Sequence, residues 1–215
     1  MKLSDLPIEA IGVGGIYFFT VMMGLAFVAQ IREIFRRRSV QTISSSWIIY
    51  FSAMFMSGII YGLTYHRQPV LINNLTLAAA HAVIALGIFR YRGFSRRDWW
   101  FIGGLAAALG IMAFSRRQDI WFIAFFPGGV LAILKQSSQI WIERKVGVLN
   151  PWLLASFVVS NIFWTAYALV ANDWTLQIIC PTNLVACSIL FGSWWRFRRP
   201  SPDIPAIATG SLPSN

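Results

Sequence analysis

Seven apolar runs constrain this chain more than any other feature. They cover about residues 8–31, 46–65, 70–89, 99–114, 120–142, 151–171 and 176–195. A transmembrane helix needs about 20 apolar residues, and a helix satisfies its own backbone hydrogen bonds inside hydrocarbon. The chain is 57% hydrophobic and 12% charged, whereas soluble domains carry about 25% charged residues. The sequence therefore predicts an all-α, polytopic membrane protein with seven transmembrane helices.

A short internal repeat divides these helices into two sets of three. Gly58-Ile-Ile-Tyr61-Gly-Leu matches Trp164-Thr-Ala-Tyr167-Ala-Leu position by position. Each stretch is followed by a short polar break and a helix with Asn near its start. One odd helix between the sets lets the second set cross the membrane in the same sense as the first. We therefore expect two parallel three-helix repeats joined by a linker helix, a 3-1-3 order.

This order predicts the division of the chain. The first three-helix repeat is expected at 8–91, the linker transmembrane helix at 98–115 and the second repeat at 119–197. The linker is rich in Gly and Ala, which let helices approach closely, and we assign it no chemistry. Residues 200–215 are rich in Pro, Ser and Gly, a composition typical of a disordered tail, here on the cytoplasmic side.

Basic residues gather on one side of the membrane in this arrangement. Twelve lie on the side of the C-terminus, and four lie on the opposite side: Lys2, Arg67, Arg116 and Arg117. The positive-inside rule then places the N-terminus outside and the C-terminus in the cytoplasm. Because the charges sit between apolar runs, the net charge of +10 does not indicate nucleic-acid binding. Short loops and the lack of an evident cleavage site favour a bacterial inner membrane.

Two asparagines inside apolar helices are the leading candidates for a solute site. An amide in hydrocarbon is costly unless it is paired, and Asn74 and Asn183 each lie about one turn into a helix. A carboxamide donates and accepts hydrogen bonds at once, which suits a solute rich in hydroxyl or amide groups. Asn73 is the alternative to Asn74 if the register slips by one residue. Such residues can also simply bond neighbouring helices, but their matching places in the repeat favour binding.

Further candidates lie near the asparagines. Trp164 offers a flat apolar face to a ring-shaped solute, and Asn161 and Ser160 are its neighbours on the same helix. Gly58 takes the place of Trp164 in the first repeat, so we expect the cavity to be asymmetric, with room on that side. Packing at the membrane interface is an equally good reading of the tryptophan.

His81 and two glutamines complete the candidates from residues alone. His81 lies seven residues after Asn74 and hence on about the same helix face. It could carry a proton, although a neutral histidine bonded to a neighbouring helix is the simpler interpretation. Gln30 and Gln139 lie near the inner ends of their helices, where they either take part in gating or bridge helices.

The 3-1-3 order, the W-x-x-Y motif at 164–167 and the P-x-N motif at 181–183 resemble the SWEET and PQ-loop transporter superfamily. Each half alone is similar to the bacterial semiSWEETs. The resemblance covers roughly residues 8–195. It implies facilitated movement of small solutes, mostly sugars, by alternating access between the two repeats, with paired asparagines and a neighbouring aromatic ring holding the solute.

The resemblance also assigns roles to single positions. The paired asparagines of the family match Asn74 and Asn183, and its span-six tryptophan matches Trp164, with Gly58 as a departure in the first half. The glutamines of the PQ motif match Gln30 and Gln139, but Ala29 and Ser138 replace the prolines. Pro151 is the remaining hinge candidate.

Catalytic chemistry is not expected. The sequence shows no metal-ligand spacing, nucleophile motif or phosphate-binding loop, so we expect neither an enzyme nor a cofactor or metal. The sequence predicts a transporter of a small polar solute, a sugar first of all. The alternative is a receptor or scaffold of the same fold that binds a ligand or peptide without transport. The expected partners are the solute and the lipid bilayer, with no nucleic acid; a homo-oligomer is left open.

Overall fold

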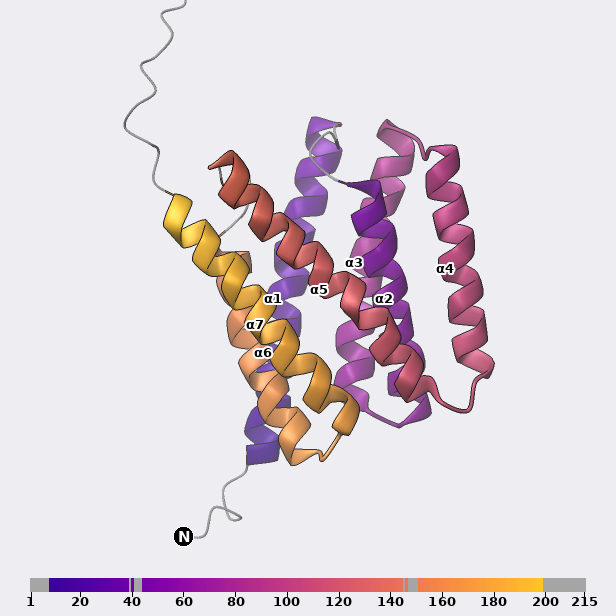
Figure 1. Cartoon of the computed structure of the whole chain (residues 1–215), viewed down its shortest axis with the longest axis vertical. Helices are drawn as coiled ribbons and strands as arrows, with labels where there is room; N and C mark the ends of the chain where they lie inside the picture. The colour runs from indigo at the N-terminus through magenta and orange to yellow at the C-terminus, as the bar shows by residue number, and fades with distance from the viewer. Residues whose placement is uncertain (1–7, 39, 41–43, 145, 147–150, 199–215) are drawn as a thin grey trace, which may run out of the picture.

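The computed structural model describes residues 8–38, 40, 44–144, 146 and 151–198, and within them the chain folds into helices joined by short loops (Figure 1). The predicted all-α fold with seven helices is confirmed. The helices are α1 (Ile8–Arg37), α2 (Ser45–Thr64), α3 (Gln68–Tyr91), α4 (Arg96–Phe114), α5 (Gln118–Glu143), α6 (Pro151–Val170) and α7 (Trp174–Phe197). The tail predicted at 200–215 lies outside the described residues.

Five helices are long and apolar enough to cross a membrane by length and composition: α1, α2, α3, α5 and α7. The described apolar part of α6 is shorter and covers Leu154–Val170. Helix α4 begins with the charged run Arg96-Arg97-Asp98. There Ser95 and Asp98 form a capping box, and Oδ1 of Asp98 also accepts a hydrogen bond from the Ser45 hydroxyl at 2.9 Å. This charged end suits the edge of a bilayer better than its interior.

The two sets of three helices follow the same path at an interval of 106 residues. Arg38 and Arg144, after α1 and α5, both adopt the left-handed conformation, as do His66 and Asn172, after α2 and α6. Both steps, from 38 to 144 and from 66 to 172, are 106 residues, and so is the step between the tyrosines of the sequence repeat. The residues that follow α1 and α2 therefore match those that follow α5 and α6.

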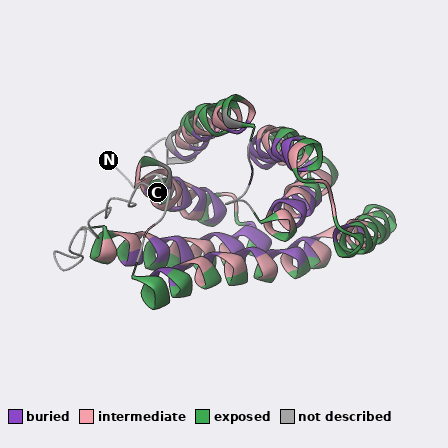
Figure 2. Cartoon of the chain, turned by 90° about the horizontal axis from the view of Figure 1, so that it is seen from above, coloured by how far each residue is buried: buried purple, intermediate pink, exposed green. Residues whose placement is uncertain are grey.

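Six helices form a closed ring, and α4 lies outside it. Around the ring, α1 contacts α3, α3 contacts α2, α2 contacts α5, α5 contacts α7, α7 contacts α6, and α6 returns to α1. Exchanging the two halves leaves this order unchanged, as two parallel three-helix repeats require. Helix α4, at the right in Figures 1 and 2, packs mainly on α2 and is largely exposed. The residue bounds 8–91, 98–115 and 119–197 stay a prediction.

The buried core shows how the halves are held together. At the end carrying the α1–α2 and α5–α6 loops, each half has its own cluster, in which Ile34, Ile48 and Ile84 of one correspond to Ile140, Leu154 and Leu190 of the other. At the opposite end, one cluster takes residues from all seven helices. The halves therefore share one core at one end of the bundle. At the other end the buried residues form two separate clusters, and Trp47 of α2 packs against both.

Candidate solute-binding cavity

A cavity of about 700 Å³ lies between the two halves. Its walls come from all six ring helices, and α4 contributes none of the described lining residues. Gln30, Ser44, Arg92 and Gln139 line it and are exposed, so its mouth lies at the end where each half has its own core. The volume falls within the range of about 300–1,000 Å³ found for pockets that take small molecules.

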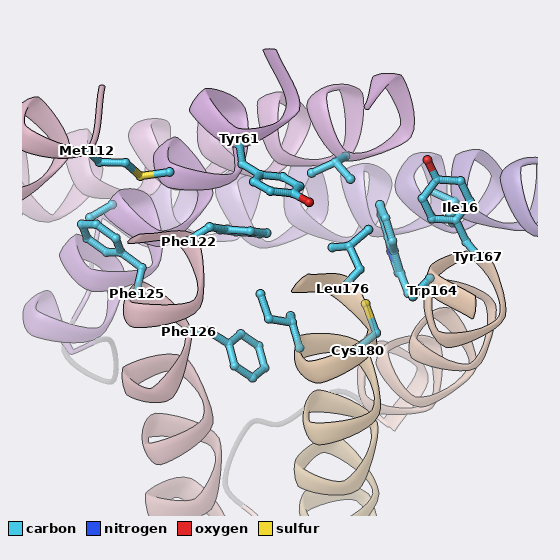
Figure 3. Packing of buried hydrophobic residues seen from close by; sticks show 14 residues of the cluster. Ile16, Tyr61, Met112, Phe122, Phe125, Phe126, Trp164, Tyr167, Leu176 and Cys180 are labelled. Atoms are coloured by element: carbon cyan, nitrogen blue, oxygen red, sulfur yellow. The ribbon is translucent and has the colours of Figure 1, made fainter. Parts of the chain in front are cut away.

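The shared core closes the other end of the cavity. Side chains from several helices converge there, and Tyr61, Phe122, Tyr167 and Leu176 are buried among them (Figure 3). The rings of Tyr61 and Phe122 are stacked, with centroids 4.8 Å apart. These residues do not line the cavity. The cavity is thus open toward one side of the membrane and closed toward the other.

A polar link joins the two halves at the closed end. The carboxylate of Asp173 is buried and accepts hydrogen bonds from the Tyr61 hydroxyl, with distances of 2.7 and 2.8 Å to its two oxygens. It also accepts from the backbone N–H of Leu176 at 3.2 Å and so caps α7. Nε of Arg67 lies 3.2 Å from the carboxylate. The Arg67 Nε–H is not aligned for a hydrogen bond, so this contact is an ion pair by distance only.

Arg67 and Asp173 occupy equivalent positions in the two repeats, because they too are 106 residues apart. The equivalent positions carry opposite charges and meet across the boundary between the halves. Sequence reasoning missed this pair. The repeat could have revealed it: Arg67 lies six residues after Tyr61, and Asp173 lies six residues after Tyr167.

Four of the predicted residues of the second half come together. Ser160, Asn161, Trp164 and Asn183 all line the cavity. The Asn183 amide donates to Oδ1 of Asn161 at 2.9 Å, and the Asn161 amide donates to the carbonyl of Phe157 at 2.7 Å. We refer to Ser160, Asn161 and Asn183 as the amide wall.

In the first half, the structure places Asn73 rather than Asn74 at the cavity. Asn73 lines it and accepts a hydrogen bond from the Thr20 hydroxyl at 2.9 Å. Asn74 points into the interface of α2 and α3, where its amide donates to the carbonyl of Val70 at 2.8 Å. A Cβ atom on Gly58 would lie 2.3 Å from Oδ1 of Asn74. Gly58 therefore makes room for Asn74 and leaves no extra space in the cavity.

The remaining predicted residues are spread between the cavity and its mouth. His81 is buried and lines the cavity, and its Nδ1 lies 2.8 Å from the carbonyl oxygen of Leu77. Gln30 and Gln139 lie at the mouth. At the interval of 106 residues, however, the counterpart of Gln30 is Gln136, which also lines the cavity.

Pro151 is the first residue of α6 and does not line the cavity. Among the described residues, the prolines inside helices are Pro127 in α5 and Pro181 in α7. The sequence pattern predicted a hinge at neither of them. Because a proline inside a helix interrupts its hydrogen bonding, these two positions are better hinge candidates than Pro151.

Comparison with solved structures places this arrangement among known folds. A eukaryotic SWEET transporter, solved at 3.7 Å, matches with a TM-score of 0.71 over 92% of this chain and 99% of that chain, at 17% sequence identity. This chain has the SWEET fold. No protein-family profile matches the sequence, and no curated protein matches it either. At this identity the likeness shows the fold, so we argue the function from the cavity.

The SWEET fold and the apolar helices together make the chain an integral, multi-pass membrane protein. Among the described residues, no group of three or more His, Cys, Asp or Glu side chains could hold a metal ion. What the cavity offers a ligand is therefore a set of amides, a histidine, aromatic rings and, at the mouth, glutamines and Arg92.

Proposed function

We propose that the protein moves a small polar solute across the membrane by alternating access, with a sugar as the first candidate. The observation that carries this proposal is a cavity with walls from both halves, open at one end and closed at the other by a core that the halves share. Each half has its own buried cluster at the open end, and Trp47 is the one described residue packed against both. We therefore infer that the halves move as bodies and that the contacts of Trp47 change as they do. The eukaryotic SWEET transporter with the same fold supports this reading.

In this mechanism the solute enters at the mouth and bonds the amides of Asn73, Asn161 and Asn183. The halves then rock, so that their separate cores approach and close the mouth. At the other end, Tyr61 and Arg67 part from Asp173 and open a path to the opposite side. No bond is made or broken in the solute, and the protein acts without catalysis. By the distribution of basic residues, the mouth in this structure faces the cytoplasm.

Exchange in proteoliposomes tests this function. Vesicles preloaded with one unlabelled sugar, amino acid, vitamin or carboxylate at a time should accumulate its labelled form by counterflow. We expect the Asn183→Ala variant to lower the exchange rate of the transported solute by at least about tenfold, because the solute loses a hydrogen-bond partner in the cavity. Asn74→Ala is the matched control, since this amide lies outside the cavity, and it should exchange normally. Wild-type exchange in Asn183→Ala would refute the assignment of the site.

The alternative is a receptor or scaffold that binds a ligand without moving it. Ala29 and Ser138 stand where the related motif has proline, and this departure favours the alternative. Counterflow separates the two functions. A ligand that raises the melting temperature of the purified protein, but is never exchanged across the bilayer, would establish a receptor in place of a transporter.

A further inference from the structure

An aromatic wall lies within the first half of the cavity. It consists of Phe27 from α1, Phe51 and Phe55 from α2, and His81 from α3, and all four rings line the cavity. The centroid of the His81 ring lies 4.9 Å from those of Phe27 and Phe55 and 6.0 Å from that of Phe51. These spacings are those of aromatic rings in contact. The four side chains therefore form one continuous surface.

The other half repeats only one ring of this surface. At the interval of 106 residues, Phe51 corresponds to Phe157, which also lines the cavity. Phe27, Phe55 and His81 correspond to Ile133, Asn161 and Cys187, which line the cavity and are not aromatic. Asn161 belongs to the amide wall, which is bonded to Asn183. The four rings in contact are thus found in one half, whereas the other half sets the amide wall beside Phe157 and Trp164, although the two halves share one backbone path.

His81 gives the aromatic wall one directed polar atom. A carbonyl oxygen only accepts hydrogen bonds, so the contact of Nδ1 with Leu77 assigns the ring proton to Nδ1. Nε2 is then an acceptor. A group that approaches the wall and donates a hydrogen bond, such as a phenol or a ring N–H, satisfies it.

The charges of the cavity lining argue against an ammonium ligand for the aromatic wall. Clusters of aromatic rings often bind ammonium groups through cation–π contacts. Here the described lining residues include Arg92 and His81 but no Asp or Glu, so a cationic solute would find no countercharge. A neutral ring satisfies both the charge and the shape of the surface.

We propose that the transported solute joins a neutral planar ring to a part rich in hydroxyl or amide groups. The ring packs on Phe27, Phe51 and Phe55, with a donor to Nε2 of His81, while the polar part bonds Asn161 and Asn183. The cavity of about 700 Å³ gives room for both parts at once. This inference rests on the proposed function, because it takes the cavity as the solute site.

Matched glycosides test the proposal. Thermal unfolding of the purified full-length protein is followed with phenyl and methyl glycosides of glucose, galactose and mannose. One added ring contact gives about tenfold tighter binding, so for at least one sugar the phenyl glycoside should act at about a tenth of the methyl glycoside concentration. In Phe55→Leu this advantage should disappear. In the control variant Phe157→Leu, which changes a cavity residue of the other half, it should persist.

A second arm tests His81. A para-hydroxyphenyl glycoside, which can donate to Nε2, should bind more tightly than the phenyl glycoside to the wild type and no more tightly to His81→Phe. Equal binding of phenyl and methyl glycosides, a phenyl preference that survives Phe55→Leu, or no stabilisation by any glycoside would each overturn the proposal. Binding that depends on the phenyl group but is not accompanied by counterflow would support the ring-binding role of the aromatic wall and refute the transport function. Counterflow of sugars without a preference for phenyl glycosides would support the transport function and refute the ring-binding role of the aromatic wall.

Discussion

Asp173 is the residue on which the contacts of the closed end converge. It caps α7, accepts from Tyr61 and faces Arg67 of the other half, while its own side chain is 2% exposed. Arg67 is 34% exposed, so water screens part of the ion pair. The stability of this link therefore comes mainly from the hydrogen bonds and the cap, and the ion pair adds less.

Replacing Asp173 should loosen the closed end. Loss of the cap costs about 1 kcal/mol, and loss of a hydrogen bond to a charged group costs about 1.5–3 kcal/mol. We expect Asp173→Ala to lower the free energy of unfolding by about 3 kcal/mol, measured by chemical or thermal unfolding in detergent. Glu33→Gln is the control, because the side chains of Glu33 and its ion-pair partner Arg36 are 38% and 67% exposed and such pairs contribute about 0–1 kcal/mol. Equal effects of the two variants would contradict the assigned role.

Gly58 and Asn74 form a second test at this scale. In Gly58→Ala the new Cβ would meet the Asn74 side chain at 2.3 Å, and overpacking of this kind costs about 1–3 kcal/mol. In the double variant Gly58→Ala, Asn74→Ala the obstructing side chain is gone, so most of the loss should be recovered. Melting temperatures of the two single variants and the double variant measure this coupling. Additive losses would show that the two side chains do not compete for one space.

At the scale of the helix, the two halves differ in where proline interrupts them. Pro127 and Pro181 lie inside α5 and α7, whereas the equivalent positions of α1 and α3 carry Val21 and Leu75. A proline removes one backbone hydrogen bond and permits a helix to bend. Movement of the second half is therefore expected to involve bending of its helices, and the first half should move more rigidly.

The variants Pro127→Val and Pro181→Leu transfer the residues of the first half to the second. Each restores a backbone N–H, so we expect a higher melting temperature together with an exchange rate that falls several-fold. Pro151→Ala is the control, because proline at the first position of a helix interrupts no hydrogen bond. A lower melting temperature, or an unchanged exchange rate in both Pro127→Val and Pro181→Leu, would show that α5 and α7 do not bend at these prolines.

At the scale of the whole molecule, one shared core and two separate cores define which side of the cavity is open. The two cysteines report on this directly. Cys187 lines the cavity, whereas Cys180 belongs to the shared core, although both are buried to the same extent. Accessibility of the two thiols to a reagent should therefore differ.

We expect a membrane-impermeant thiol reagent to modify Cys187 from the side where Ser44 and Arg92 line the mouth, and to leave Cys180 unmodified. Mass spectrometry of the labelled protein, from vesicles of both orientations, measures the modified fraction. Asp173→Ala should increase the labelling of Cys187 from the opposite side, because it weakens the closed end. Labelling of Cys180 as fast as Cys187 would contradict the closed core.

Much of the helical architecture could be predicted from the pattern of apolar and polar residues. The lengths of the apolar runs predicted the helices, because hydrocarbon leaves a helix as the way to satisfy the backbone. The tyrosine repeat predicted two parallel halves. The amide and tryptophan candidates of α6 and α7 also lie at the cavity, since the spacing of three residues between Asn161 and Trp164 fixes a shared helix face.

The number of helices, their grouping into two halves and the choice of polar residues worth testing follow from the sequence alone, because these depend on local spacing and on the cost of polar groups in a bilayer. The choice between Asn73 and Asn74 required the folded chain, since one residue turns a side chain by about 100° around the helix axis. The contact of Arg67 with Asp173 and the placing of four rings opposite the amide wall also appear only in the fold, because both depend on which helices meet around the ring.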